Sequence, residues 1–328
     1  QQTLDAINLA AGPMLGREYA ARYLPDATRQ QAVAIATQVR DALQRNVDNS
    51  TWLGEAAKQE ARKKIGKLGI EIGAPKRDLD YSVQPMGRGS FGGNMLIAAT
   101  WRHREEMKRI GRGNAERRWD VLPQQPALAY DLAHNRLIVT AAMLQAPVFD
   151  PAMPLGGQYG AFGALVGHEL SHAVDGRGRM VDADGNVRDW WTGAEAGAWD
   201  VTAQRVVSLY DTFVYPGLPA LKVNGKLTRD ENVADLAGLE LARAAFVAAE
   251  PKGGATADKA FYTGWAQVWA QQVTAEEAQR RSLQDVRAPG QWRTNAPIMQ
   301  QGAFGTAFAC KVGTPMQPKP EARISIFH

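Results

Sequence analysis

Five consecutive residues near the middle of the chain constrain its fold more than any other feature. His168 and His172 are four positions apart, and Glu169 directly follows the first histidine. Positions i and i+4 share one face of an α-helix, so both imidazoles can bind one tetrahedral ion while the carboxylate points toward its open side. The spacing therefore predicts a helix with a zinc site suited to hydrolysis. Residues from about 158 to 174 are largely Gly, Ala, Leu, Val and Phe, which predicts that this helix is buried.

A catalytic zinc site needs a third protein ligand and an open position for water. Glu231 and Asp235 are again i and i+4 at the start of a predicted helix, so one can bind metal while the other orients a histidine. Asp175, three residues after His172, can orient that ring in the same way. The segment Thr228–Glu231 also fits a capping box in which Glu231 caps its own helix, and spacing alone leaves both roles open.

Helical and strand patterns surround this motif. An apolar stripe with a 3.6-residue period over 32–43 predicts one helix, and residues 55–68 predict a second. Residues 127–130 and 136–140 are two short apolar runs separated by turn residues, which is typical of a β-hairpin. A strand just before the metal-binding helix is suited to form the edge of a cleft, where an extended peptide adds as one more strand.

Turn and capping signals follow the metal-binding helix. Asp182, Asp184 and Asn186 are spaced as in a calcium loop, but no acidic residue stands at its twelfth position, so a simple turn is predicted. Thr192 and Glu195 form a capping box that predicts the start of another helix.

Composition excludes several other classes of protein. Hydrophobic residues make up 45% of the 328 positions, enough for a large core, while the single Cys310 excludes an intrachain disulfide. No apolar run of about 18 residues is present, so no membrane span is predicted. The net charge is only +4, and the basic run over 101–118 is interleaved with glutamates, which predicts a solvated helix face and no nucleic-acid partner.

The motifs, their order and their spacing resemble the neprilysin-type M13 family of zinc metallopeptidases over nearly the whole chain. The segments that carry the resemblance are 167–175, 184–186, 189–192 and 231–235, with further agreement at 16–19, 73–75, Asn135, 144–149, 285–293 and 307–313. The resemblance implies an α+β, mainly helical catalytic domain of the thermolysin-like (gluzincin) type with a small β-sheet. It implies that residues 1–328 form a single catalytic domain corresponding to the C-terminal half of the family, with the N-terminal capping domain absent from this chain.

The resemblance also implies a role for each residue of the motif. Three residues are expected to bind one Zn²⁺ per chain: His168, His172 and Glu231. Glu169 is the expected general base, which takes a proton from a zinc-activated water, while Asp175 and Asp235 support the two histidines. Asp235 also counts among the expected catalytic residues. The implied activity is that of a zinc-dependent metalloendopeptidase that cleaves on the amino side of a residue held in an apolar pocket.

Substrate contacts are expected from one strand and from the C-terminal region, with two departures from the family pattern. Ala127, Leu128 and Tyr130 lie on the expected substrate-binding strand, but Ala127 stands where the family usually has asparagine. Arg293 matches the family arginine that contacts the substrate carbonyl. Arg287 stands where the family usually has an oxyanion-stabilising histidine, and as a cationic donor it is expected to act as a catalytic residue.

The expected partners are peptide substrates and either a separate N-terminal-half polypeptide or a second subunit. An extracytoplasmic location, periplasmic or secreted and in a bacterium, is the expectation drawn from the family. The alternative function is a non-catalytic or highly specialised zinc-containing peptide-binding module that acts with a partner chain. Only the departures at Ala127 and Arg287 favour that alternative.

Overall fold

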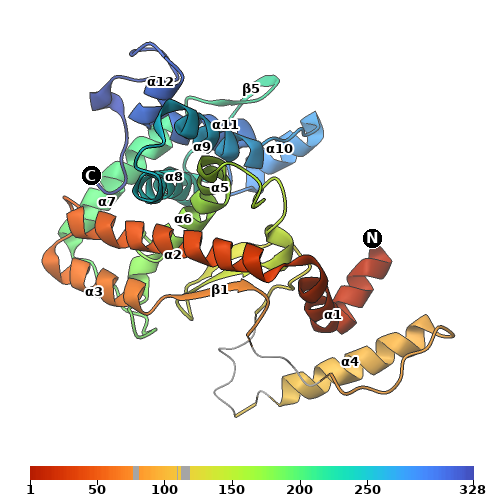
Figure 1. Cartoon of the computed structure of the whole chain (residues 1–328). Helices are drawn as coiled ribbons and strands as arrows, with labels where there is room; N and C mark the ends of the chain where they lie inside the picture. Colours follow the sequence, from red (N-terminus) through yellow and green to blue (C-terminus); the bar gives the residue numbers. More distant parts are fainter. Residues whose placement is uncertain (77–80, 109, 112–118) are drawn as a thin grey trace. The chain divides into compact units, whose positions relative to one another are not determined.

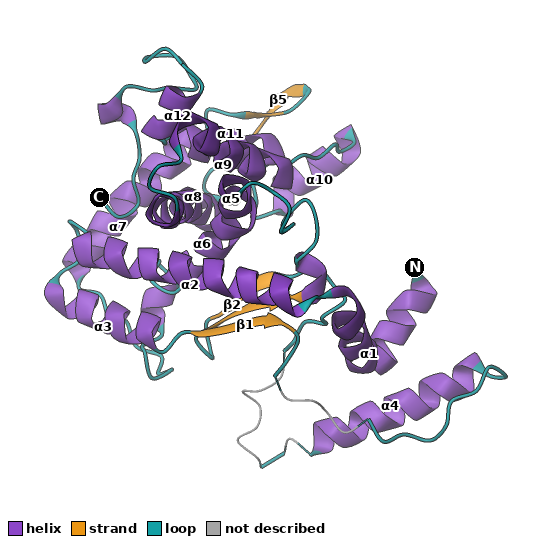
Figure 2. Ribbon diagram, viewed as in Figure 1, coloured by secondary structure: helices purple, strands orange, loops and turns teal. Residues whose placement is uncertain are grey.

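The chain is mainly helical, with short strands, as the computed structural model shows for residues 1–76, 81–108, 110–111 and 119–328 (Figures 1 and 2). The predicted fold class is thus confirmed. Contacts divide the chain into two compact units, each assembled from separate segments. The first unit comprises Gln1–Gln30, Glu71–Ala129 and Ile138–Gln145, and the second comprises Gln31–Ile70, Tyr130–Leu137 and Ala146–His328.

The first unit contains two long helices that pack together. α1 (Gln2–Tyr23) contacts α4 (Phe91–Met107) through a small core of Ala10, Ala11 and Ala98. The basic run predicted over 101–118 begins in α4, but its residues 109 and 112–118 lie outside the described part of the chain.

The strands form a sheet in the order β1–β3–β2 and a separate hairpin. β1 covers Gly69–Gly73, β2 covers Leu128–Asp131, and β3 covers Arg136–Thr140. The predicted hairpin is confirmed, because β2 and β3 are neighbours and the segment 132–135 connects them. β2 ends the strand order and is therefore an edge strand of this sheet. β4 (Val214–Tyr215) pairs antiparallel with β5 (Leu218–Lys222).

Helices dominate the second unit. Its helical segments are most of α2 (Asp26–Asn49), α3 (Glu55–Gly66), α5 (Leu155–Gln158), the π-helical η3 (Tyr159–Gly163), α6 (Ala164–Ser171), η4 (Gly178–Met180), α7 (Gly193–Tyr210), α8 (Arg229–Ala249), α9 (Gly254–Val268), α10 (Ala275–Gln284), α11 (Gly290–Met299), α12 (Gly302–Ala307) and η5 (Pro320–Ala322). The apolar stripe predicted over 32–43 is the buried face of α2. No helix in the described ranges is both long enough and apolar enough to cross a membrane.

The start of α7 confirms the predicted capping box. The Thr192 hydroxyl accepts from the Glu195 backbone N–H, and the Glu195 carboxylate accepts from the Thr192 N–H at 2.6 Å. The other carboxylate oxygen of Glu195 accepts from the Gly54 N–H at 2.8 Å, just before α3. The predicted turn after Asp182 is also present, because its Oδ1 accepts from the N–H groups of Asp184 and Asn186.

α6 and α8 approach each other at a pair of glycines. A Cβ atom added to Gly167 of α6 would lie 2.6 Å from the Gly238 carbonyl oxygen. One added to Gly238 would lie 2.5 Å from the backbone nitrogen of His168. Both obstacles are backbone atoms, which cannot move aside as a flexible side chain would. Glycine at both positions therefore allows the spacing that holds the first histidine of the motif against α8.

Gly238→Ala is expected to destabilise the protein by roughly 1–3 kcal/mol, because an overpacked contact must push the two helix backbones apart. Urea denaturation of the purified chain measures this change. The matched control is Gly197→Ala in α7, where an added Cβ meets nothing within 4 Å. That control is expected to be neutral or stabilising by up to about 1 kcal/mol, since alanine favours helix more than glycine does. Equal effects at the two positions would contradict the packing argument.

Candidate metal centre

Three side chains of the second unit come together in an arrangement that can hold a metal ion. His168, His172 and Glu231 each offer one ligand atom, and these atoms lie within 4.8 Å of one another. His168 is on α6, His172 caps its C-terminus, and Glu231 is in the first turn of α8. The structure thus brings the three predicted ligands to one point, although the chain separates the histidines from the glutamate by about 60 residues.

The two histidine rings are held by carboxylates from behind. His168 Nδ1 lies 2.7 Å from Asp235 Oδ1, and His172 Nδ1 lies 2.7 Å from Asp175 Oδ2. Each hydrogen bond fixes the ring and leaves its Nε2 for a ligand, which is the usual arrangement behind metal-binding histidines. Asp175 and Asp235 therefore lie where the sequence predicted them.

Glu231 faces the histidines and does not cap its own helix. Thr228, the residue before α8, makes no side-chain cap. Glu231 Oε2 is buried, and it lies 3.5 Å from His168 Nε2 and 3.1 Å from Arg287 Nε. Of the two roles left open by the sequence, the geometry favours that of a ligand. A buried carboxylate oxygen that faces a histidine Nε2 is suited to share a metal ion with that ring.

The charge balance of the cluster also suits a cation. Burial works to lower the pKa of His168, but Asp235 and Glu231 outweigh it and raise that pKa to about 9. Burial works to raise the pKa of Glu231, but His168, followed by Arg287 and His172, lowers it to about 2. These opposite shifts reflect ionised carboxylates concentrated around two imidazoles. Two imidazole nitrogens and one carboxylate form a donor set typical of catalytic zinc, so the residues present fit this ion.

Glu169 is positioned by the backbone of strand β2. Its Oε2 accepts a hydrogen bond from the Tyr130 N–H at 2.9 Å. The Tyr130 side chain points elsewhere and donates to Asn135 Oδ1 at 2.8 Å. Glu169 is half-buried and directly follows His168 in the chain. Its role as general base stays a prediction.

Arg293 is engaged with Asp235, the carboxylate behind His168. Its Nε and Nη2 donate to the two oxygens of Asp235, each at 2.7 Å, and both side chains are buried. The guanidinium also lies over the Trp269 ring, 3.6 Å from its centroid. One carboxylate therefore joins Arg293 to His168, a predicted ligand. The role of Arg293 as a substrate contact stays a prediction.

Arg287 also lies at the centre, with its Nε 3.1 Å from Glu231 Oε2 and its side chain half-exposed. The other predicted contacts, Ala127 and Leu128, belong to the first unit, where the Ala127 N–H donates to the Thr140 hydroxyl. The roles of Arg287, Ala127 and Leu128 in catalysis or substrate binding stay predictions.

Two supporting residues were not predicted from the sequence. Lys64 of α3 is fully buried, and Asn135 bridges Tyr130 to the Lys64 carbonyl oxygen. A signal for Lys64 was present, because it shares an apolar helical stripe with Ala57 and Ala61. A lysine on such a stripe indicates a buried partner. For Asn135 the resemblance marked the position but gave it no role.

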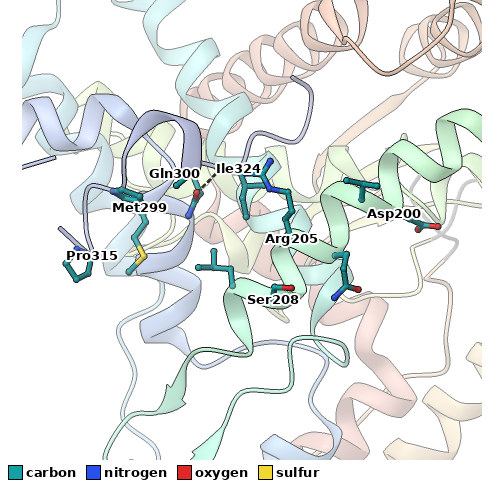
Figure 3. A pocket seen from close by; sticks show the side chains of 12 residues that line it. Asp200, Arg205, Ser208, Met299, Gln300, Pro315 and Ile324 are labelled. Atoms are coloured by element: carbon teal, nitrogen blue, oxygen red, sulfur yellow. Dashed lines mark hydrogen bonds between the residues drawn. The ribbon is translucent and has the colours of Figure 1, made fainter. Parts of the chain in front are cut away.

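Two hollows of the second unit differ in their relation to this centre. One, of about 380 Å³, has Arg287, Trp269, Gln271 and Arg281 in its lining, so it adjoins the centre through Arg287. The other, of about 870 Å³, lies between α7 and the C-terminal region (Figure 3). None of its described lining residues belongs to the metal centre.

Comparisons with known proteins place this centre in a family of metallopeptidases. A model described as peptidase family M13 matches residues 129–324, which include all the residues that surround the candidate ion. A second M13 model, for the N-terminal part, matches residues 1–75. The chain belongs to peptidase family M13, and the predicted resemblance is confirmed.

Individual relatives agree with this assignment. An endothelin-converting enzyme homologue from Locusta migratoria is 28% identical over 96% of this chain and 45% of its own length. The zinc metalloprotease Zmp1 of Mycobacterium tuberculosis, in its open state, superposes with a TM-score of 0.89 at 27% identity, over 99% of this chain and 52% of that one. PepO from Lactobacillus rhamnosis gives a TM-score of 0.86 at 27% identity, over 98% and 50%.

The chain spans about half the length of these relatives. The M13 match and the His–His–Glu cluster together indicate zinc as the metal. Whether residues 1–328 form a single catalytic domain stays a prediction.

Asp235→Asn is expected to destabilise the protein by about 3–5 kcal/mol, because it leaves the buried Arg293 without a counter-charge. It is also expected to weaken zinc binding by about 10- to 100-fold through His168. Chemical denaturation and competition with a chromophoric chelator measure the two effects. Asp230→Asn, on the same helix, is the control: Asp230 pairs with the surface arginines Arg177 and Arg229. A loss of at most about 1 kcal/mol is expected there. Similar losses in both variants would contradict this role for Asp235.

Proposed function

We propose that this chain is a zinc-dependent metalloendopeptidase that binds one Zn²⁺ through His168, His172 and Glu231. The observation that carries the proposal is the convergence of three ligand atoms within 4.8 Å beside Glu169. The carboxylates behind both rings support it, because they direct each Nε2 away from Asp175 and Asp235. When bound, zinc supplies Lewis-acid chemistry, lowering the pKa of water and polarising a carbonyl group.

Glu169 moves the protons in this reaction. The Tyr130 N–H holds its Oε2, which leaves Oε1 to take a proton from the attacking water. The water oxygen forms a bond to the scissile carbonyl carbon. Glu169 then returns that proton to the leaving amine nitrogen as the C–N bond breaks. The products are an amine and a carboxylic acid, which loses its remaining proton to solvent and becomes a carboxylate.

Arg287 is the candidate for stabilising the oxyanion that develops on the carbonyl oxygen. Its guanidinium is already at the metal centre, next to Glu231, and remains half-exposed to a ligand from solvent. A guanidinium carries a positive charge and several N–H donors, both of which stabilise an oxyanion.

Peptides are the proposed substrates, bound in extended form along the edge strand β2. The edge position leaves backbone groups of β2 for pairing with a peptide. In this proposal Ala127, Leu128 and Tyr130 lie along the bound peptide. The backbone contacts come from groups other than the Ala127 and Tyr130 N–H, which donate to Thr140 and Glu169. Arg293 contacts a substrate carbonyl. The residue bound after the cleaved bond is expected to be apolar, as the family resemblance implies.

A separate polypeptide equivalent to the remaining half of the family is the proposed partner. The first unit exposes large apolar side chains on two packed helices: Leu4 and Leu9 on α1, and Phe91 and Leu96 on α4 are each more than half exposed. Co-expression with that polypeptide, followed by size-exclusion chromatography, tests the pairing. Co-elution is expected, and separate elution would contradict it.

An extracytoplasmic location, periplasmic or secreted and in a bacterium, is also proposed from the family resemblance. Fractionation of the native organism, followed by immunodetection, tests it. Recovery of the protein with cytoplasmic markers would overturn this location.

Glu169→Gln is expected to keep zinc and to lower peptide turnover by about 10²- to 10⁴-fold, because the amide cannot take the proton. Metal analysis gives the zinc content, and mass spectrometry of a digested peptide library gives the turnover. Glu231→Gln is the contrasting variant, expected to lose both zinc and activity.

Full cleavage by the Glu169→Gln variant would overturn the assigned mechanism. If the unaltered chain binds zinc and peptides but cleaves none of them, the chain is instead a peptide-binding module.

A further inference from the structure

Lys64 is a fully buried lysine in the part of the chain that the N-terminal M13 model matches. Its ammonium group donates to the carbonyl oxygens of Gly178 and Val181, at 2.7 and 2.8 Å. Burial lowers the pKa of Lys64 to about 8, with Asp175 and Asp182 acting in the opposite direction. Burying a charged group is unfavourable unless it is well hydrogen-bonded, so this lysine is held by a specific set of contacts.

The first of these contacts leads to a metal ligand. Gly178 lies in the loop that folds back against the end of α6, where an added Cβ would lie 2.3 Å from the His172 carbonyl oxygen. The Gly178 N–H donates to Asp175 Oδ1 at 2.7 Å, and the other oxygen of Asp175 holds the His172 ring. Lys64 thus holds Gly178, Gly178 holds Asp175, and Asp175 holds the His172 ring.

A second route leads from the backbone of Lys64 to the general base. The Lys64 carbonyl oxygen accepts from Asn135 Nδ2 at 2.7 Å, and Asn135 Oδ1 accepts from the Tyr130 hydroxyl. The Tyr130 N–H then donates to Glu169. Asn135 has a φ of +48°, in the left-handed region that asparagine tolerates better than most residues. The two routes together connect Glu169 and His172 through α3.

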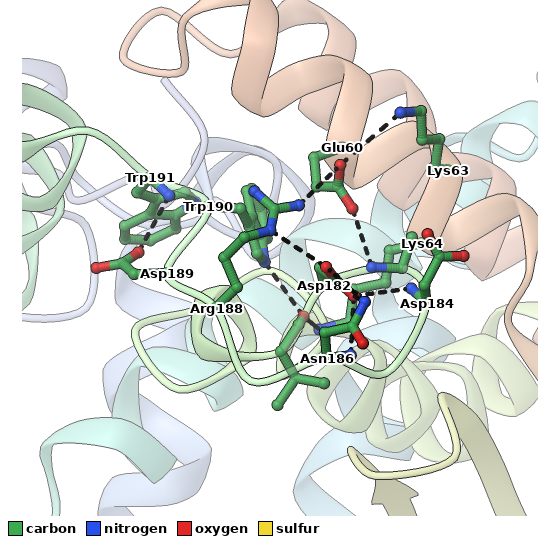
Figure 4. A network of polar contacts seen from close by, with 12 residues as sticks. Glu60, Lys63, Lys64, Asp182, Asp184, Asn186, Arg188, Asp189, Trp190 and Trp191 are labelled. Carbon is green, nitrogen blue, oxygen red and sulfur yellow. Dashed lines mark hydrogen bonds and ion pairs between the residues drawn. The ribbon is translucent and has the colours of Figure 1, made fainter.

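The loop is further attached to α3 by a polar network around Lys64 (Figure 4). Glu60, one turn before Lys64, accepts from the Ala183 N–H at 2.9 Å and pairs with Arg188 at 3.4 Å. Arg188 in turn pairs with Asp182 at 3.2 Å. Because these contacts anchor the loop beyond Val181, the loss of the Lys64 ammonium need not release the loop. The effects of Lys64 on Gly178 can therefore be tested in a folded protein.

We propose that Lys64 is a positioning residue of the metal centre. Its ammonium group holds His172 through Gly178 and Asp175. Its backbone carbonyl holds Glu169 through Asn135 and Tyr130. The inference rests on the proposed function. It means that α3, which lies in the segment matched by the N-terminal M13 model, supports the chemistry of the motif at residues 168–172. Lys64 touches neither the ion nor the substrate in this role.

Lys64→Met tests the first route in the full chain. Methionine retains the apolar stem but removes the donor to Gly178 and Val181. The zinc dissociation constant, measured by chelator competition, is expected to rise by about 10- to 100-fold, the usual effect of losing support behind a ligand. The d–d absorption spectrum of the cobalt-substituted protein is expected to change as well.

Lys63→Met is the matched control, since the neighbouring Lys63 is largely exposed and lies 3.9 Å from its ion-pair partner Glu60. Its zinc affinity is expected to stay within about 2-fold of the unaltered chain, as for most surface substitutions. If Lys64→Met lowers stability but binds zinc as Lys63→Met does, Lys64 only anchors the loop and the inference fails. If methionine prevents folding, Lys64→Gln is the milder variant, because its amide can still donate to one carbonyl. An unaltered zinc affinity in Lys64→Gln would also overturn the inference.

Asn135→Gly tests the second route without straining the backbone, because glycine accepts a positive φ. The variant is expected to keep its zinc affinity and KM while kcat falls about 10-fold or more, since Glu169 loses its positioning. An unchanged kcat would overturn this route.

If the unaltered chain binds no zinc, the proposed function fails. If the unaltered chain binds zinc and Lys64→Met binds it equally, only the inference about Lys64 fails.

Discussion

The backbone contact between Gly167 and Gly238 sets the geometry on which the metal centre depends. The axes of packed helices are normally about 8–10 Å apart, and the distance depends on the side chains at the contact. Two facing glycines allow the smallest distance between the axes. Here the contact immediately precedes His168 and follows Asp235 by three residues. The first histidine therefore reaches both the carboxylate behind it and Glu231 from one α6–α8 interface. The ligand distances follow from helix packing more than from loop structure.

Asp235 combines two electrostatic roles that would otherwise need two carboxylates. It accepts from His168 with one oxygen and receives a bidentate pair from Arg293, while its own side chain is fully buried. Burying one carboxylate with two donors costs less desolvation than burying two separate pairs. It also couples His168, Asp235 and Arg293 energetically, so substitutions at these positions are expected to be non-additive.

The sequence predicted the parts of this site that depend on helical spacing. The i, i+4 pairs of His168 with His172 and of Glu231 with Asp235 fixed which side chains share a helix face, and the Thr192–Glu195 box fixed the start of α7. Spacing alone left the choice between ligand and cap for Glu231 open, and the family resemblance gave it the ligand role. The packing of α8 on α6, a contact between distant segments, brings Glu231 to the histidines. Spacing could not reveal that Arg293 pairs with Asp235, or that Lys64 meets the loop at Gly178. Both depend on tertiary contacts that leave no periodic signal, apart from a lysine on an apolar stripe.

The Glu195 carboxylate connects the starts of two helices that are distant in the chain, because it reaches Gly54, 141 positions away. One oxygen closes the capping box of α7, and the other accepts the backbone N–H of Gly54, the residue that caps α3. The positive ends of two helix dipoles therefore share a single negative charge. The start of α3 thus depends on a side chain of α7, so α3 is expected to unfold together with α7, in one cooperative transition, and not to fray from the end of the domain. That cooperativity extends the stability of the core to a helix near the start of the sequence.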